Sequence, residues 1–183
     1  MRTYKIEGIV LKRRNFGEAD RVLTVLSKES GKIQVKAPGV RRIPSRRSSH
    51  VELLNLSEFT LYSGSRSFMP IVTEAETLED FSLIKNTLEK ISYAYYICEL
   101  INSFCPDNQE NRRAFFLFKE VLLNLDKGEN PNQLISYFEK ELLRILGFWK
   151  ESTLLETQDS RIVIEKLLEK KLKTLRAFPL SAS

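Results

Sequence analysis

Short runs of β-branched and aromatic residues, several alternating with polar residues, fill the first eighty positions of the chain. These runs predict strands at residues 4–12, 21–27, 32–37, 53–62 and 68–75. The clearest alternation, at residues 32–37, predicts a strand with one face in solvent. The polar segment 13–20 and the glycine-containing segments 28–31 and 63–67 are expected to form turns. The first eighty residues therefore predict a small antiparallel sheet.

Five short antiparallel strands commonly close into a barrel, because closure removes the exposed edges of a small sheet. The OB-fold is the most common five-stranded solution, and it is the barrel that we predict here. We expect an α+β fold, with an N-terminal five-stranded OB-fold barrel at residues 1–79 that binds nucleic acid and an all-α helical domain at residues 80–183.

Apolar residues recur at intervals of three and four after residue 80, which is typical of helices. The spacing predicts helices over residues 84–101, 115–125, 134–146 and 164–175. Asp80 is a candidate N-cap for the first helix, and Pro131 lies where a first-turn proline is favoured in the third. Gly147 is expected to cap the end of the third helix.

Positive charge is concentrated at the start of the chain. The whole sequence has 29 Lys and Arg against 24 Asp and Glu, whereas residues 1–50 have 13 basic and four acidic side chains. No acidic residue occurs between Ser30 and Val51, so this stretch favours an external polyanion such as a phosphate backbone. The side chains expected to contact DNA are Lys12, Arg13, Arg14, Arg21, Lys36, Arg41, Arg42, Arg46, Arg47 and Arg66.

Three residues near the predicted contacts have alternative interpretations. Arg21 follows Asp20 at the start of a predicted strand, so it could contact phosphate or pair with a nearby carboxylate. Phe16 could stack on a base, although packing beneath the barrel is the interpretation that we favour. Phe68, close to Arg66, carries the same pair of interpretations.

The composition excludes several classes of function. No apolar run approaches the roughly 20 residues of a membrane span, and the N-terminus has no signal-peptide core. Two cysteines and one histidine are too few for a four-cysteine zinc site, a multi-histidine site or most cysteine–histidine catalytic arrangements. We therefore predict a cytoplasmic protein with no catalytic residues, no metal and no cofactor.

Two alternatives remain open from the residues alone. An OB-fold with a cationic loop also suits RNA. Glu74, Glu76, Glu79 and Asp80 could form a metal-dependent nuclease site. Acidic residues are also expected at this position because they complement the dipole of a following helix, so the nuclease interpretation is the less favoured one.

Several short motifs occur in a fixed order: EGIVLK at residues 7–12, FGEADRVLT at 16–24, GK at 31–32, PGVRR at 38–42, SR at 45–46 and LY at 61–62. Their order and spacing resemble those of the RecO family, bacterial recombination mediators in DNA repair. Further along, LLRILGF at residues 142–148 is similar to a segment of the family's helical domain.

The resemblance implies a non-enzymatic protein that binds single- and double-stranded DNA without strong sequence preference, anneals complementary strands and helps to load a recombinase on SSB-coated DNA. It also implies a RecR-like partner, contact with the C-terminal tail of SSB, and association with the nucleoid. Many RecO proteins have a zinc-binding cysteine cluster after the LLRILGF-like segment, but this chain has no cysteine after Cys105. We therefore expect an abridged form that lacks zinc.

Overall fold

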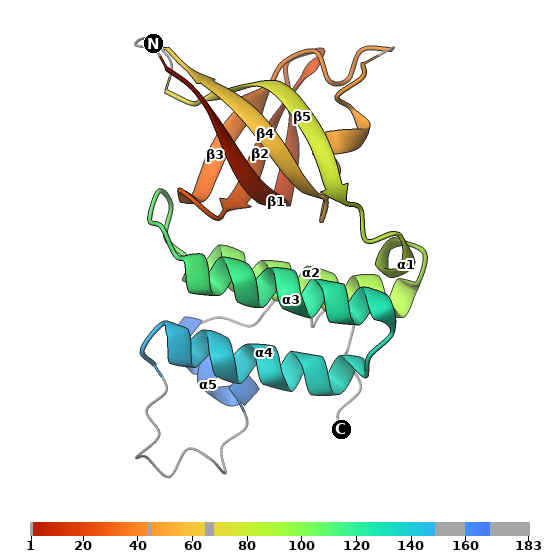
Figure 1. Cartoon of the computed structure of the whole chain (residues 1–183). Coiled ribbons are helices and arrows are strands. Elements are labelled where there is room, and N and C mark those ends of the chain that lie inside the picture. The colour runs from red at the N-terminus through yellow and green to blue at the C-terminus, as the bar shows by residue number, and fades with distance from the viewer. Residues whose placement is uncertain (1, 44, 65–67, 149–159, 169–183) are drawn as a thin grey trace. The chain divides into compact units, whose positions relative to one another are not determined.

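The computed structural model describes residues 2–43, 45–64, 68–148 and 160–168. Its strands are β1 (Arg2–Phe16), β2 (Asp20–Ser27), β3 (Gly31–Ala37), β4 (Leu56–Ser63) and β5 (Ile71–Glu79), with a short 3-10 helix η1 (Ser49–Val51) before β4. The strands form a closed barrel in the order β1-β2-β3-β5-β4 (Figure 1). The predicted five-stranded barrel and the α+β class are confirmed.

Three strands have boundaries that differ clearly from the prediction, and one of them is β5, which spans Ile71–Glu79 instead of residues 68–75. β1 continues to Phe16, because its pairing with β2 extends through the polar segment that we expected to be a turn. β4 begins at Leu56, because Leu54 adopts a positive φ of 68° and places the chain in a turn before the strand starts. Polar composition was therefore a poor guide to the end of β1.

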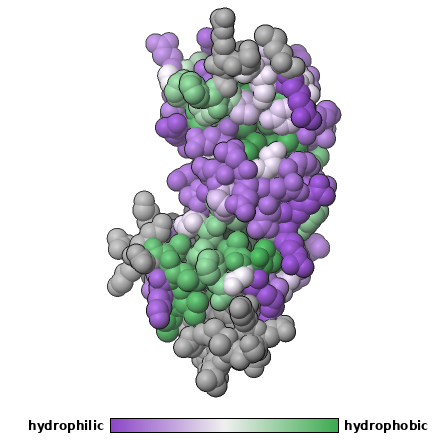
Figure 2. All heavy atoms as spheres, turned by 90° about the vertical axis from the view of Figure 1, so that its left-hand side faces the viewer, coloured by the Kyte–Doolittle hydropathy of each residue, from purple (hydrophilic) through white to green (hydrophobic). Residues whose placement is uncertain are grey.

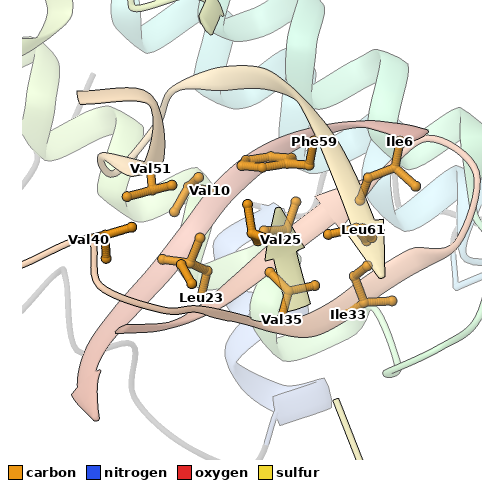
Figure 3. Packing of buried hydrophobic residues seen from close by; sticks show 12 residues of the cluster. Ile6, Val10, Leu23, Val25, Ile33, Val35, Val40, Val51, Phe59 and Leu61 are labelled. Carbon is orange, nitrogen blue, oxygen red and sulfur yellow. The ribbon is translucent and has the colours of Figure 1, made fainter. Parts of the chain in front are cut away.

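The barrel interior is filled by alternate residues of its strands. Figure 3 shows side chains such as Val10, Leu23, Val25, Val35 and Phe59 pointing toward one another inside the barrel, and all five are fully buried. Burial of each such side chain contributes about 1.5–3 kcal/mol. The opposite set of residues on β1, β2 and β3 consequently points outward.

A β-bulge in β1 changes which residues point outward. Val10 lies opposite Val25, but the next pair is Lys12 and Thr24, so Leu11 has no counterpart on β2. Without this extra residue, Lys12 would follow Val10 onto the interior face. The bulge instead turns Lys12 and Arg14 to the outer surface.

The described residues from Ser82 on are mostly helical, as predicted, but the one helix expected over residues 84–101 is divided in two. Residues 169–175 of the predicted fourth helix lie outside the described residues. The helices are α1 (Ser82–Lys85), α2 (Leu88–Phe104), α3 (Arg112–Lys127), α4 (Pro131–Ile145) and α5 (Ser160–Leu168). Asn130 caps α4 immediately before Pro131, and Gly147 ends it with a φ of 80°, which confirms the predicted positions of the proline and the glycine. The prediction that Asp80 is an N-cap is wrong, because the residue that precedes α1 is Phe81 in a left-handed conformation.

A buried carboxylate connects three of these helices. Glu139 on α4 is 1% exposed and accepts a hydrogen bond from the Tyr96 hydroxyl of α2 at 2.5 Å. Ser160, the first residue of α5, also donates to Glu139, and the Arg161 Nε lies 3.5 Å from its Oε1 atom. Every buried charge needs such partners, and this one joins helices that are far apart in sequence.

The chain divides into two compact units. The barrel unit contains residues 1–80 and the segment Cys105–Phe115, and the helical unit contains Phe81–Phe104 and the described residues from Phe116 on. Figure 2 shows a broad hydrophobic area on the helical unit, which has exposed apolar side chains such as Ile162. Among the described helices, none has the length and apolarity that a membrane span requires.

Candidate nucleic-acid interface

The outer face of β1, β2 and β3 carries three of the predicted DNA contacts, Lys12, Arg14 and Lys36. Two rows of facing residues cross these strands: Lys12–Thr24–Gln34 and Arg14–Val22–Lys36. Facing residues of neighbouring strands share one side of a sheet, so the three cations lie on a common surface. A cavity of about 310 Å³ on this surface is lined by residues that include Lys12, Arg14 and Gln34.

The side chains of Lys12 and Arg14 are both exposed, and neither side chain makes a hydrogen bond or ion pair within the described residues. Lys36 is held in place, since its ammonium lies 2.9 Å from Asp20 Oδ2. That ammonium and the backbone N–H of Gly39 both hydrogen-bond the Asp20 carboxylate and lower its pKa. Asp20 therefore remains charged and orients one cation of the surface.

The basic segment, residues 38–49 after β3, is fixed at its start against the β1–β2 turn. The backbone N–H of Arg41 donates to the carbonyl of Ala19 at 2.9 Å, and its guanidinium donates to the carbonyl of Gly17 at 3.0 Å. Arg42 lies close enough to Asp20 to lower the pKa of that carboxyl further. We use the name cationic face for the group formed by Lys12, Arg14, Lys36, Arg41 and Arg42.

Arg13 and Arg21 have a different environment. Arg13 lies opposite Leu23, a core residue, so strand alternation places it on the other side of β1 from Lys12 and Arg14, although it also lines the cavity of about 310 Å³. Both guanidinium groups pair with Glu52, with Arg21 Nη1 3.0 Å from Oε1. Burial, together with the neighbouring arginines, lowers the pKa of Arg21. Of the two interpretations of Arg21, the structure shows the carboxylate pair.

The remaining predicted contacts are Arg46, Arg47 and Arg66. The Arg47 guanidinium donates to the carbonyls of Val72 at 2.6 Å and Pro38 at 2.7 Å, and so joins the basic segment to β5. Arg46 is exposed. Arg66 lies outside the described residues.

The expectation that Phe16 packs beneath the barrel is wrong. Its ring is 45% exposed, and the Lys36 ammonium lies 5.0 Å from the ring centroid. Phe16 is the last residue of β1 and follows Lys12 and Arg14 at intervals of two, so the bulge sends it outward with them. The sequence signal for this arrangement is the uninterrupted apolar run before Lys12, which breaks strict alternation.

Acidic side chains lie on another part of the barrel. Glu7, Glu58 and Glu76 face one another across β1, β4 and β5. Glu74, one of the candidate nuclease residues, accepts a hydrogen bond from the Thr60 hydroxyl at 3.1 Å. Among the described residues, no group of three or more His, Cys, Asp or Glu side chains is placed to hold a metal ion. These facing carboxylates lie on β1, β4 and β5, whereas the facing cations Lys12, Arg14 and Lys36 lie on β1 and β3.

Two family models cover most of the chain. The model described as the N-terminal part of recombination protein O matches residues 1–81, and the model of the C-terminal part matches residues 85–149. The chain belongs to the RecO family. The predicted resemblance is therefore confirmed, and it extends through the helical unit as far as residue 149.

Individual RecO relatives agree with the family models. The DNA repair protein RecO of Dehalococcoides mccartyi is 36% identical over 148 residues, which cover 81% of this chain and 58% of the relative. The RecO protein of Acetivibrio thermocellus is 37% identical over 149 residues, which cover 81% of this chain and 59% of that protein. The chain thus matches less than two thirds of the length of these relatives.

Proposed function

We propose that this chain is a DNA-binding recombination mediator that holds single- and double-stranded DNA on the cationic face without strong sequence preference. The observation that carries the proposal is the gathering of three cations on one outer surface of the barrel, with Arg41 and Arg42 of the basic segment held beside it. In OB-folds, the surface of the second and third strands and the loop between the first two strands are the usual oligonucleotide sites. The cationic face occupies the same region of this barrel.

The mechanism is electrostatic. Each phosphate neutralised by a cation releases condensed counterions, and this release drives binding independently of the base sequence. The planar guanidinium groups of Arg14, Arg41 and Arg42 can each pair with two phosphate oxygens. Five contacts with single-stranded DNA give a slope of log K against log salt of about −3.5.

Annealing follows from the same property. A surface that neutralises phosphates and reads no base edges lowers the repulsion between two complementary strands without blocking their pairing. Family membership supports the further steps: recombinase loading on SSB-coated DNA, a RecR-like partner and contact with the tail of SSB. Association with the nucleoid follows if DNA is the main ligand.

The test replaces three exposed cations of the cationic face together, in the variant Lys12→Ala/Arg14→Ala/Arg42→Ala. We expect the salt slope for single-stranded DNA to become shallower by about 2 and annealing to slow. The control, Lys127→Ala/Lys140→Ala/Lys166→Ala, removes the same charge from exposed positions of the helical unit and should bind as the parent chain does. Equal losses in both variants would show that net charge, rather than this surface, governs binding.

Two further measurements separate the alternatives. Competition between DNA and RNA of equal length tests the RNA interpretation, which predicts that RNA displaces DNA at lower concentration. Incubation of DNA with the protein and Mg²⁺ or Mn²⁺ tests the nuclease interpretation. Cleavage that is lost in a Glu74→Gln variant would favour an enzyme.

A further inference from the structure

Phe16 is an aromatic side chain exposed in the middle of a polar, cationic surface. Phe16 is 45% exposed and therefore forgoes part of the stabilisation that burial of a phenyl group provides. Strand alternation places it on the same side of β1 as Lys12 and Arg14. Its exposure is therefore imposed by the register of the barrel and not by a position on a free loop.

The ring is held at this place by its neighbours. The Lys36 ammonium lies 5.0 Å from the ring centroid and is fixed by Asp20, 2.9 Å away. The carbonyl of Gly17, the residue after Phe16, accepts a hydrogen bond from the Arg41 guanidinium at 3.0 Å. The aromatic side chain is consequently flanked by groups that suit phosphates, on a segment whose backbone is paired with β2 as far as Asp20.

The other exposed phenyl group of the barrel has the opposite surroundings. Phe68, which is fully exposed, lines a separate cavity of about 600 Å³ together with the carboxylates of Glu29, Asp107 and Glu110. Carboxylates repel a phosphate chain, so an aromatic ring there is poorly placed for a nucleotide. The combination of an exposed ring and adjacent cations occurs at Phe16.

We propose that Phe16 is a stacking platform for an unpaired base and gives the cationic face a preference for single-stranded over double-stranded DNA. The inference rests on the proposed DNA-binding function and adds to it a residue with a distinct role. Every base has a π face, so stacking on an aromatic side chain tolerates any sequence. In a duplex each base is already stacked and paired, and it reaches the ring only if it is first extruded from the helix.

The experiment uses the full chain with a fluorescently labelled 20-nucleotide single strand and a 20-base-pair duplex at one salt concentration. Stacking of one base changes affinity by about fivefold or more. We expect Phe16→Ala to weaken single-strand binding by at least that factor and to change duplex binding by less than twofold. The salt slope should stay the same, because no phosphate contact is removed.

Three companion variants complete the test. Phe16→Trp should retain the single-strand preference, whereas Phe16→Leu, which keeps an apolar side chain without a π face, should lose it. Phe68→Ala removes the same group from the acidic cavity and should change neither affinity. Equal effects of Phe16→Ala on single strand and duplex, an unchanged single-strand affinity, or an equal loss in Phe68→Ala would each overturn the proposal.

The same measurements distinguish this proposal from the one on which it depends. If the cationic face is not the DNA site, Lys12→Ala/Arg14→Ala/Arg42→Ala will bind both DNA forms as the parent does. If the cationic face is the site but Phe16 does not stack, the triple variant will lose affinity for both single strand and duplex. In that case Phe16→Ala will keep the same ratio of single-strand to duplex affinity as the parent chain.

Discussion

Gly31, the first residue of β3, is predicted to be irreplaceable for a reason that does not depend on DNA. It adopts a φ of +67°, and a Cβ atom added to it would lie 1.8 Å from the carbonyl oxygen of Gln109 and 2.4 Å from its carbonyl carbon. Both atoms belong to the backbone, so no rotation of a side chain can relieve the overlap. The substitution Gly31→Ala must therefore displace the segment that lies against β3.

The magnitude follows from the contacts that this displacement breaks. A left-handed conformation costs an alanine about 1–2 kcal/mol. Moving the segment also weakens the hydrogen bond from Asn108 N–H to the Lys32 carbonyl, 2.7 Å long, and the ion pair between Lys32 and Asp107 at 3.1 Å. These losses add about 2–3 kcal/mol, so we expect Gly31→Ala to lower the free energy of unfolding by about 3–5 kcal/mol.

Gly39 provides a matched control within the same unit. Its φ is +70°, but a Cβ atom there would meet nothing within 4 Å, so Gly39→Ala carries the backbone cost alone. Urea denaturation and thermal melting of the full chain measure the difference, which should amount to a melting temperature about 5–10 °C lower for Gly31→Ala than for Gly39→Ala. Unfolding free energies within 0.5 kcal/mol of each other, roughly the scatter of ordinary surface substitutions, would refute the steric argument.

Three more outcomes can be checked. Glu52→Gln should release Arg13 and Arg21 for phosphate contact and steepen the salt slope for single-stranded DNA by up to about 1.4; an unchanged slope would show that neither arginine reaches DNA. Glu139→Ala should lower the free energy of unfolding by about 2–4 kcal/mol in urea titrations, because it removes the carboxylate that accepts hydrogen bonds from two buried hydroxyl groups, and Glu139→Gln should cost less. Burial raises the pKa of Cys98 to about 12, so iodoacetamide at pH 8 should alkylate it far more slowly in the native protein than in urea, as mass spectrometry would report; equal rates would contradict the burial.

Local patterns were sufficient for the type and order of most elements of this fold, but not for all of their boundaries. The five strands follow from β-branched residues and turn signals within a few positions of each other, and the helices follow from apolar spacing of three and four. Asn130 and Pro131 start α4 through interactions with the adjacent residues alone. The family resemblance was also visible in the sequence, because its motifs are short and occur in a fixed order.

The grouping of the cations was beyond such reasoning. Lys12, Arg13 and Arg14 are consecutive and look alike in the sequence, yet the register after the bulge at Leu11 places Arg13 opposite a core residue of β2, and Glu52 binds its guanidinium. The carboxylate that binds Arg13 is Glu52, 39 residues away, and no local pattern indicates that pair.

The amino-acid order by itself determined where charge is concentrated and which segments become strands or helices, because both depend on neighbouring residues. Only the tertiary structure decided which cations remain available to a ligand and which are used to hold the barrel together. Those choices depend on the register between strands and on carboxylates and carbonyls brought close by long-range pairing. The exposure of Phe16 belongs to the same class, because a single extra residue in β1 sets which face its ring occupies.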